Sequence, residues 1–165
     1  MALLKKPQSI VDGNIWINGT SHLGVSTSAK TPKIATGKNE QKVGGFTRKL
    51  SNGIFEALEA EFEIAEYSPV VMKTIEESEE IEVLLKASLI SGGTKVPFIA
   101  TWKGLAEVED GELKAGENVS RKVKMDLHTA ILVIDGYEHY RLKINDLVGV
   151  VDGVDRYEEL RKHIM

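Results

Sequence analysis

Apolar and polar residues alternate one by one along three stretches of the chain, at residues 54–64, 81–89 and 119–131. Such alternation is typical of β-strands that bury one face and expose the other. Each stretch is therefore predicted to be a strand whose apolar residues point into the core. These inward residues are Leu58, Ala60, Phe62 and Ile64 in the first stretch, Ile81, Val83, Leu85, Ala87 and Leu89 in the second, and Val123, Met125, Leu127, Thr129 and Ile131 in the third.

Pairs of residues that favour tight turns separate these stretches. In each pair a glycine can adopt the positive φ angle that a short hairpin turn requires. Successive strands joined by tight turns pair in the antiparallel sense, so the chain is predicted to be an antiparallel, mainly β domain. The pairs are Asp12-Gly13, Asn18-Gly19, Asn52-Gly53, Gly92-Gly93, Asp110-Gly111, Asp135-Gly136 and Asp152-Gly153.

A first short helix is predicted at residues 68–75. The segment begins with a Ser-Pro pair, which is a favourable helix start. Val71, Met72 and Ile75 follow at the spacing of one helical face. We expect this face to pack on the sheet.

A second short helix is predicted at residues 155–162, near the C-terminal end of the sequence. It begins with an acidic capping residue, and Glu158 and Lys162 stand four positions apart, as a stabilising ion pair requires. We expect this helix to pack on the sheet through Tyr157 and Leu160.

The stretch from about residue 31 to 52 shows neither the strand nor the helix period. It is polar, basic and contains glycine, so it is predicted to be a long polar loop. Loops of this length within compact domains are usually functional. At 165 residues, the chain as a whole, 1–165, is predicted to form a single domain.

The net charge of −4 conceals an uneven distribution of charges. Basic residues dominate positions 1–50, whereas positions 56–82, which include Glu79, carry many glutamates and the single lysine Lys73. The negative total argues against nucleic-acid binding, because affinity for phosphate needs clustered Lys and Arg. The asymmetry has two interpretations: neutralisation within one monomer, or head-to-tail contact between identical subunits.

Residues suited to catalysis or metal binding do not gather in the sequence. The chain has no cysteine, and its four histidines lack the spacing of metal ligands. Residues 91–95 lack the order of a phosphate-binding loop and are predicted to be a hairpin turn. No apolar run is long enough to span a bilayer. We therefore expect no enzymatic activity, no cofactor, no metal and no membrane anchor.

Several short segments follow one another in an order typical of a known family. They are Ile15–Gly19, Leu23–Val25, Thr31–Ile34, the glycine-rich Val43–Phe46, Trp102–Gly104 with Glu107, Gly116–Glu117, and Asn145–Met165 with its Val151–Glu158 core. In these segments the chain resembles the major tail tube proteins of contractile-tailed phages of the P2 type. The resemblance extends over nearly the whole sequence.

This resemblance implies a fold and a function. The implied fold is an antiparallel β-sandwich or partly open barrel with one short flanking helix and a short C-terminal helix. The implied function is a non-enzymatic structural subunit that forms hexameric rings, stacked into a hollow tube inside a contractile phage tail or tail-like particle. Strands of all subunits in a ring would join into one closed inner barrel.

The resemblance also implies partners and a location. The main partner is the chain itself, followed by the tail sheath protein and by baseplate and tail terminator proteins. DNA would be a transient passenger that the tube does not bind. The protein would be made in the cytoplasm of the bacterial host and would reside in the virion tail tube or tail-like particle.

Two groups of residues are candidates for these roles. The acidic face formed by Glu59, Glu61 and Glu63 is the candidate lumen wall, since like charge keeps DNA from binding; an outward face towards the sheath is the alternative. The basic stretch is the candidate ring-stacking element. Its residues are Lys33, Lys38, Lys42, Gly44, Gly45, Phe46, Arg48 and Lys49.

Three other functions remain open from the sequence. The tube of a type VI secretion or other contractile injection system would have the same architecture. A monomeric β-sandwich module that binds sugars or peptides would need an exposed aromatic patch, for which Trp16 and Trp102 are the available tryptophans. A hydrolase with paired carboxylates is the least favoured alternative. Its two carboxylates would face each other across a cleft, whereas Glu59, Glu61 and Glu63 are predicted along one face of one strand.

Overall fold

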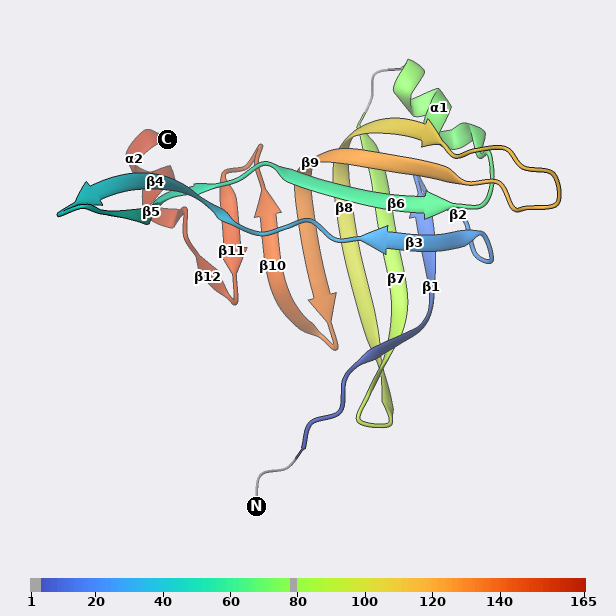
Figure 1. The fold of residues 1–165 in the computed structure, drawn as a ribbon, viewed down its shortest axis with the longest axis horizontal. Helices are drawn as coiled ribbons and strands as arrows, with labels where there is room; N and C mark the ends of the chain where they lie inside the picture. The colour runs from blue at the N-terminus through green and yellow to red at the C-terminus, as the bar shows by residue number, and fades with distance from the viewer. Residues whose placement is uncertain (1–3, 78–79) are drawn as a thin grey trace.

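The computed structural model describes residues 4–77 and 80–165, so Glu79 of the acidic stretch lies outside the described residues. It consists of strands and two short helices (Figure 1). The strands are β1 (Ser9–Ile17), β2 (Thr20–Ser21), β3 (Ser26–Lys30), β4 (Thr36–Val43), β5 (Phe46–Phe55), β6 (Leu58–Ile64), β7 (Ile81–Ser91), β8 (Thr94–Asp110), β9 (Arg121–Ile134), β10 (Tyr137–Lys143), β11 (Val148–Val151) and β12 (Val154–Asp155), and the helices are α1 (Pro69–Glu76) and α2 (Glu158–Ile164).

The strands form one large antiparallel sheet and one separate hairpin. The large sheet has ten strands. Eight of them lie side by side in the order β12, β11, β10, β9, β8, β7, β1 and β2, while β6 also pairs with β9 and β3 pairs with β6. The hairpin consists of β4 and β5. The predicted mainly β, antiparallel fold class with two short helices is confirmed, and within the described residues the sheet does not close into a barrel.

The large sheet folds back on itself at β8 and β9, which take part in two layers. One edge of β9 pairs with β6 over residues 121–127 and with β10 over residues 129–134. The first layer contains β3, β6 and the adjoining halves of β8 and β9, and the second layer contains the other strands of the sheet. In Figure 1, β3 and β6 run horizontally, whereas β1, β7 and β10 run roughly vertically. This crossing of layers through shared, bent strands is the geometry of an orthogonal β-sandwich.

A β-bulge makes the bend. Lys103 of β8 pairs with Thr129, but the next residue, Gly104, pairs with Leu127, so His128 has no partner in β8. The two strands approach so closely here that a Cβ atom on Gly104 would lie 2.0 Å from the carbonyl oxygen of Asp126. Only glycine fits this position, because a bulge bends one strand sharply towards the other.

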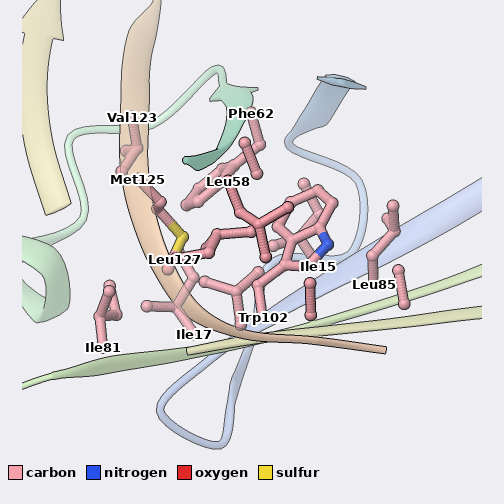
Figure 2. Packing of buried hydrophobic residues seen from close by; sticks show 14 of the residues in the cluster. Ile15, Ile17, Leu58, Phe62, Ile81, Leu85, Trp102, Val123, Met125 and Leu127 are labelled. Carbon is pink, nitrogen blue, oxygen red and sulfur yellow. The ribbon is translucent and has the colours of Figure 1, made fainter. Parts of the chain in front are cut away.

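The core lies between the two layers (Figure 2). Trp102 of the second layer is fully buried against Phe62 and Met125 of the first. The inward residues predicted for β6 are all buried, as are Ile81, Val83, Leu85 and Leu89 of β7. The alternation thus identified the core face of both strands.

The prediction for β9 is correct only up to the bulge. Val123, Met125 and Leu127 are buried, but Ala130 then takes the core position, and Thr129 and Ile131 point to the opposite face, half-buried. The extra residue at the bulge shifts the alternation by one position. Thr129 and Ile131 were therefore wrongly assigned to the core.

Helix α1 lies where it was predicted, although its packing differs in part. Val71 is buried, whereas Met72 and Ile75 are exposed. Ser68 precedes the helix without capping it through its side chain; its Oγ atom is instead 3.0 Å from Nε2 of the buried His22. The polar contact to His22 replaces the expected capping bond.

Helix α2 begins at Glu158, three residues after the predicted start. The ion pair between Glu158 and Lys162 forms at 3.0 Å. Leu160 is exposed, so the prediction that it packs on the sheet is wrong, while Tyr157 does contact the sheet. Neither helix in the described part of the chain has the length and hydrophobicity needed to cross a membrane.

Candidate assembly surfaces

The segment predicted to be a long polar loop is a regular β-hairpin, which we call the arm (β4 and β5). Its strands pair in register from Lys38 opposite Ser51 to Val43 opposite Phe46. Gly44 and Gly45 form the turn with φ angles of 54° and 84°, as a two-residue hairpin turn requires. The polar composition hid this hairpin, because neither face of it is buried in the monomer.

The arm continues the pair formed by β3 and β6 and projects beyond the sandwich (Figure 1). The predicted single strand 54–64 is divided at Glu56 and Ala57. The Glu56 backbone N–H donates to the Ala35 carbonyl at 2.8 Å, so the two pairs stay connected across the break. One half of this long hairpin therefore rests on the core and the other half is free of it.

Tyr157 fixes the base of the arm. Its hydroxyl accepts the Phe55 backbone N–H at 3.1 Å, and the two rings meet edge to face with centroids 5.5 Å apart. The same tyrosine ring lies directly over Gly149, where a Cβ atom would be 2.9 Å from it. The contact predicted for Tyr157 is thus an anchor for the arm.

A second pair holds Tyr157 in place. Asp155 accepts the Tyr157 backbone N–H at 3.0 Å and binds Arg161 of α2. The hydrogen bond from Arg161 lowers the pKa of Asp155 below its ordinary value. The carboxylate is therefore charged at neutral pH, and α2 serves to brace the base of the arm.

The arm has two chemically different faces. Because paired residues share a face, Val43, Phe46 and Leu50 lie together on one side, which we call the apolar face. Arg48 lies on this side too, and its Nε donates to Gln41 at 2.7 Å. The opposite, basic face is formed by Lys38, Glu40, Lys42, Thr47, Lys49 and Ser51.

The structure thus brings most of the predicted stacking residues onto the arm, on both of its faces. Lys33 is the exception: it lies before the arm and forms an exposed ion pair with Glu56 at 3.9 Å. Val43 and Leu50, which were not among the predicted stacking residues, complete the apolar face. Phe46 is 80% exposed, which is unusual for a phenylalanine without a partner.

Glu59, Glu61 and Glu63 lie side by side on the outer face of β6, as predicted. In the paired strand β9 they face Asp126, Lys124 and Lys122, and beyond these lie Leu105, Glu107 and Glu109 of β8. With Lys30 of β3, this acidic face carries six carboxylates and three ammonium groups. Acidic and basic side chains are therefore interspersed on this face, with an excess of acidic ones, and the face is not uniformly acidic.

The basic residues of β9 neutralise part of this face. Lys122 binds Glu61 at 3.0 Å, and this hydrogen bond raises the pKa of Lys122 above its ordinary value. Ser120 donates a hydrogen bond to Glu63. Alternation could place Lys122 and Lys124 on a polar face, but only strand pairing showed that they oppose the glutamates.

The charge asymmetry is hardly neutralised within the monomer. Among the described residues, Lys33 with Glu56 is the one salt bridge that joins the basic segment 1–50 to the acidic segment 56–82. Lys38, Lys42, Arg48 and Lys49 form none. Of the two interpretations, the structure favours charges that are available for contact with another molecule.

The polar cluster around His22 is structural. His22 is 3% exposed and hydrogen-bonds Thr20 and Ser68, whose carbonyl also accepts a bond from Arg121 at 2.9 Å. A substrate cannot reach this histidine and serine, because both are buried. In the described part of the chain, no three acidic or histidine side chains gather in a way that could hold a metal ion.

An exposed aromatic patch, which a carbohydrate- or peptide-binding module would need, does not form around the tryptophans. Trp102 is buried in the centre of the core, and Trp16 is half-buried on the outer face of β1. The two side chains point to opposite faces of the second layer, because their cross-strand neighbours do.

Residues 7–164 match the model of the family described as phage tail tube protein FII. The match extends over almost the entire chain, so the protein belongs to this family, and the resemblance seen in the sequence is confirmed. It is a structural component of a phage tail tube and not an enzyme.

One of the chains in the cryo-EM structure of the anti-feeding prophage (AFP) baseplate, six-fold symmetrised, is similar at 13% sequence identity with a TM-score of 0.43, covering 73% of this chain and 90% of that chain. No curated protein matches the sequence.

Proposed function

We propose that the protein is the subunit of the inner tube of a contractile phage tail or tail-like particle, in which hexameric rings stack around a hollow lumen. The arm carries this proposal, because within the described structure it is a two-stranded hairpin that pairs with no further strand. An isolated hairpin is only marginally stable in water. An arm with an exposed apolar face and unpaired basic residues is therefore built to be covered by a neighbouring subunit.

The arm is suited to link one ring to the next. It extends beyond the sandwich and is braced at its base by Tyr157. Its apolar face supplies contact area, while its basic face can meet the acidic surplus of another copy. The sheath, baseplate and terminator proteins would then bind the surfaces that remain outside the tube.

Removing the arm is expected to abolish stacking without unfolding the subunit. Replacing residues 39–50 by an Asn-Gly turn closes the shortened hairpin on a paired position, since Lys38 lies opposite Ser51. We expect soluble monomers or single rings in negative-stain microscopy and sedimentation, with an unchanged circular dichroism melting temperature.

The matched control shortens a loop at the other end of the molecule. Gly111 and Ser120 are joined by a 2.8 Å backbone bond, so residues 112–119 can likewise be replaced by an Asn-Gly turn. This variant should still form tubes. Tubes of normal length from the variant without the arm would contradict the stacking role.

We further propose that the acidic face lines the lumen. It lies on the first layer, whose two edge strands are β3 and the end of β8. In the described residues β3 pairs on one side with β6, and residues 105–110 of β8 pair on one side with β9, so each edge strand has a free side. Adjacent strands of this four-stranded layer are antiparallel. Because the layer has an even number of strands, β8 of one subunit and β3 of the next would also be antiparallel when they pair. Copies can therefore join into a closed antiparallel barrel.

The charge of this face supports the same role. Six carboxylates against three ammonium groups leave a negative surplus, which repels DNA and denies it the counterion release that drives binding. A polyanion could then slide through the tube without adhering.

Reversing the charge of this face is expected to slow DNA passage. The triple variant Glu59→Lys, Glu61→Lys, Glu63→Lys should retain DNA, and particles carrying it should eject their genome more slowly, with stronger retention at low salt. A control variant reverses three exposed carboxylates elsewhere, at Glu112, Glu117 and Glu159. Wild-type ejection kinetics in assembled triple-variant particles would show that the face does not line the lumen.

A further inference from the structure

The sandwich is open on one side, between β1 and β3. The two strands are close where the Ile15 N–H meets the Ser26 hydroxyl at 3.3 Å, and towards Ile10 and Thr31 a groove of about 510 Å³ separates them. The main-chain edge of β1 facing this groove has no partner strand from Ser9 to Asn14 in the described structure. The groove therefore offers both a strand edge and access to the core.

The floor of this groove is apolar. It is formed by core-facing side chains of the second layer, among them Leu85, Phe98 and Leu132. Phe98 and Leu132 are only half-buried, although they belong to the edge of the core cluster. A monomer leaves this apolar surface in contact with water, which is unfavourable.

The apolar face of the arm has the complementary pattern. Val43, Phe46 and Leu50 project from one side of a hairpin whose main-chain edges are also unpaired in the described structure. A strand that adds to a sheet edge gains main-chain hydrogen bonds, and its alternate side chains fill pockets. The arm therefore has the form of a strand added to a groove.

The arm cannot fill the groove of its own chain. Tyr157 holds its base beside β11 and α2, at one end of the sheet order, whereas β1 lies near the other end. Figure 1 shows the arm pointing away from β1. The occupant of the groove must therefore come from a second copy.

A pair of opposite charges lies at matching places. Arg48 stands between Phe46 and Leu50 on the apolar face and binds only the neutral Gln41. Asp12 lines the groove, and its carboxylate accepts the N–H of the next residue, Gly13. Among the described residues neither charge has a salt-bridge partner, so the two can pair across a contact.

We propose that the arm of one copy docks into the β1–β3 groove of another, with Phe46 inserted into the groove and Arg48 paired with Asp12. This inference rests on the proposed self-assembly and specifies its contact. The two surfaces are different parts of the chain, so each copy both inserts an arm and receives one. Such a heterologous contact propagates through an assembly instead of ending at a dimer.

Cysteine cross-linking tests the contact directly, because the natural chain contains no cysteine. Phe46→Cys is combined with Val11→Cys at the rim of the groove, and assemblies are oxidised and run on a non-reducing gel. We expect a ladder of covalent oligomers, since docking brings the two positions within disulfide reach. The control combines Phe46→Cys with Leu113→Cys, a residue that is also exposed but lies in the β8–β9 loop, and should remain monomeric on the gel.

A charge swap provides the second test. Arg48→Asp and Asp12→Arg should each raise the protein concentration needed for assembly by roughly threefold to tenfold, and the double variant should restore it. All three should keep the wild-type circular dichroism spectrum, because both residues are exposed.

The outcomes separate this inference from the proposed function. Normal tubes that cross-link only in the control pair, or a double variant that assembles no better than the single ones, would overturn the docking contact and leave the tube function intact. Wild-type protein that stays monomeric at every concentration, even with tail components present, would overturn both.

Discussion

A Gly104→Ala variant is expected to lose most of its folding stability. The added methyl group would lie 2.0 Å from the Asp126 carbonyl oxygen and 2.9 Å from the Leu127 Cα atom. All these neighbours are backbone atoms of β9, so a rotamer change cannot relieve the overlap. The strands would have to separate at the corner where the sheet folds over, and we expect a loss on the order of 4 kcal/mol or more. Urea denaturation followed by circular dichroism measures it.

Gly13→Ala is the matched control for this variant. Gly13 also lies in a strand, beside the irregularity of β1, but its added methyl group would meet nearest atoms at 3.3 Å. We expect a loss of about 1 kcal/mol or less there. A denaturation midpoint of Gly104→Ala equal to that of Gly13→Ala would show that the corner can relax, and that the bulge does not require glycine.

Replacing Trp102 by alanine is expected to have the second largest effect. The side chain is fully buried at the centre of the cluster and touches both layers of the sandwich. Its removal leaves a cavity that rigid strands cannot close, so we expect a loss of about 3–5 kcal/mol in urea denaturation. Trp102→Phe should lose much less, because it keeps most of the ring and deletes an indole N–H that has no partner among the described residues.

Trp16 provides the comparison within the same sheet. It lies on the outer face of β1 and is half-buried, so Trp16→Ala removes contacts without opening the core. Its loss should stay well below that of Trp102→Ala. Equal losses for the two variants would contradict the assignment of the core to the space between the layers.

The corner at Gly104 and the arm have different roles: the corner serves the folding of the subunit, and the arm serves its assembly. The corner lets two long strands build both layers, so one core holds the subunit together without the arm. The arm and the β1–β3 groove are then left incomplete in a single chain. Stability of the subunit and contact between subunits can therefore be altered separately, which is why arm variants are expected to change assembly and corner variants to change folding.

Much of this could be predicted from local sequence. Alternation identified the buried face of β6, most of β7 and β9 up to Leu127, and so placed Glu59, Glu61 and Glu63 on one outer face. Turn residues located the hairpin turns at Asn18-Gly19, Gly92-Gly93, Asp135-Gly136 and Asp152-Gly153, and the Ser-Pro pair located α1. The turns predicted at Asp12-Gly13 and Asn52-Gly53 were wrong, because these pairs lie within β1 and β5, and the turn of the arm at Gly44-Gly45 was not predicted. The other predictions held because each depends on neighbours within a few residues, where the periods of strand and helix are written directly into the chain.

The tertiary structure decided the rest. Nothing local shows that His128 is a bulge residue, that Lys122 faces Glu61, or that residues 36–55 form a hairpin with an apolar and a basic face. Each of these depends on pairing between strands distant in sequence, or on the absence of a core beneath the arm. Apolar and polar residues alternate along a strand only where one face is buried in the same chain. A strand whose faces are both exposed in the monomer, like those of the arm, does not show this pattern.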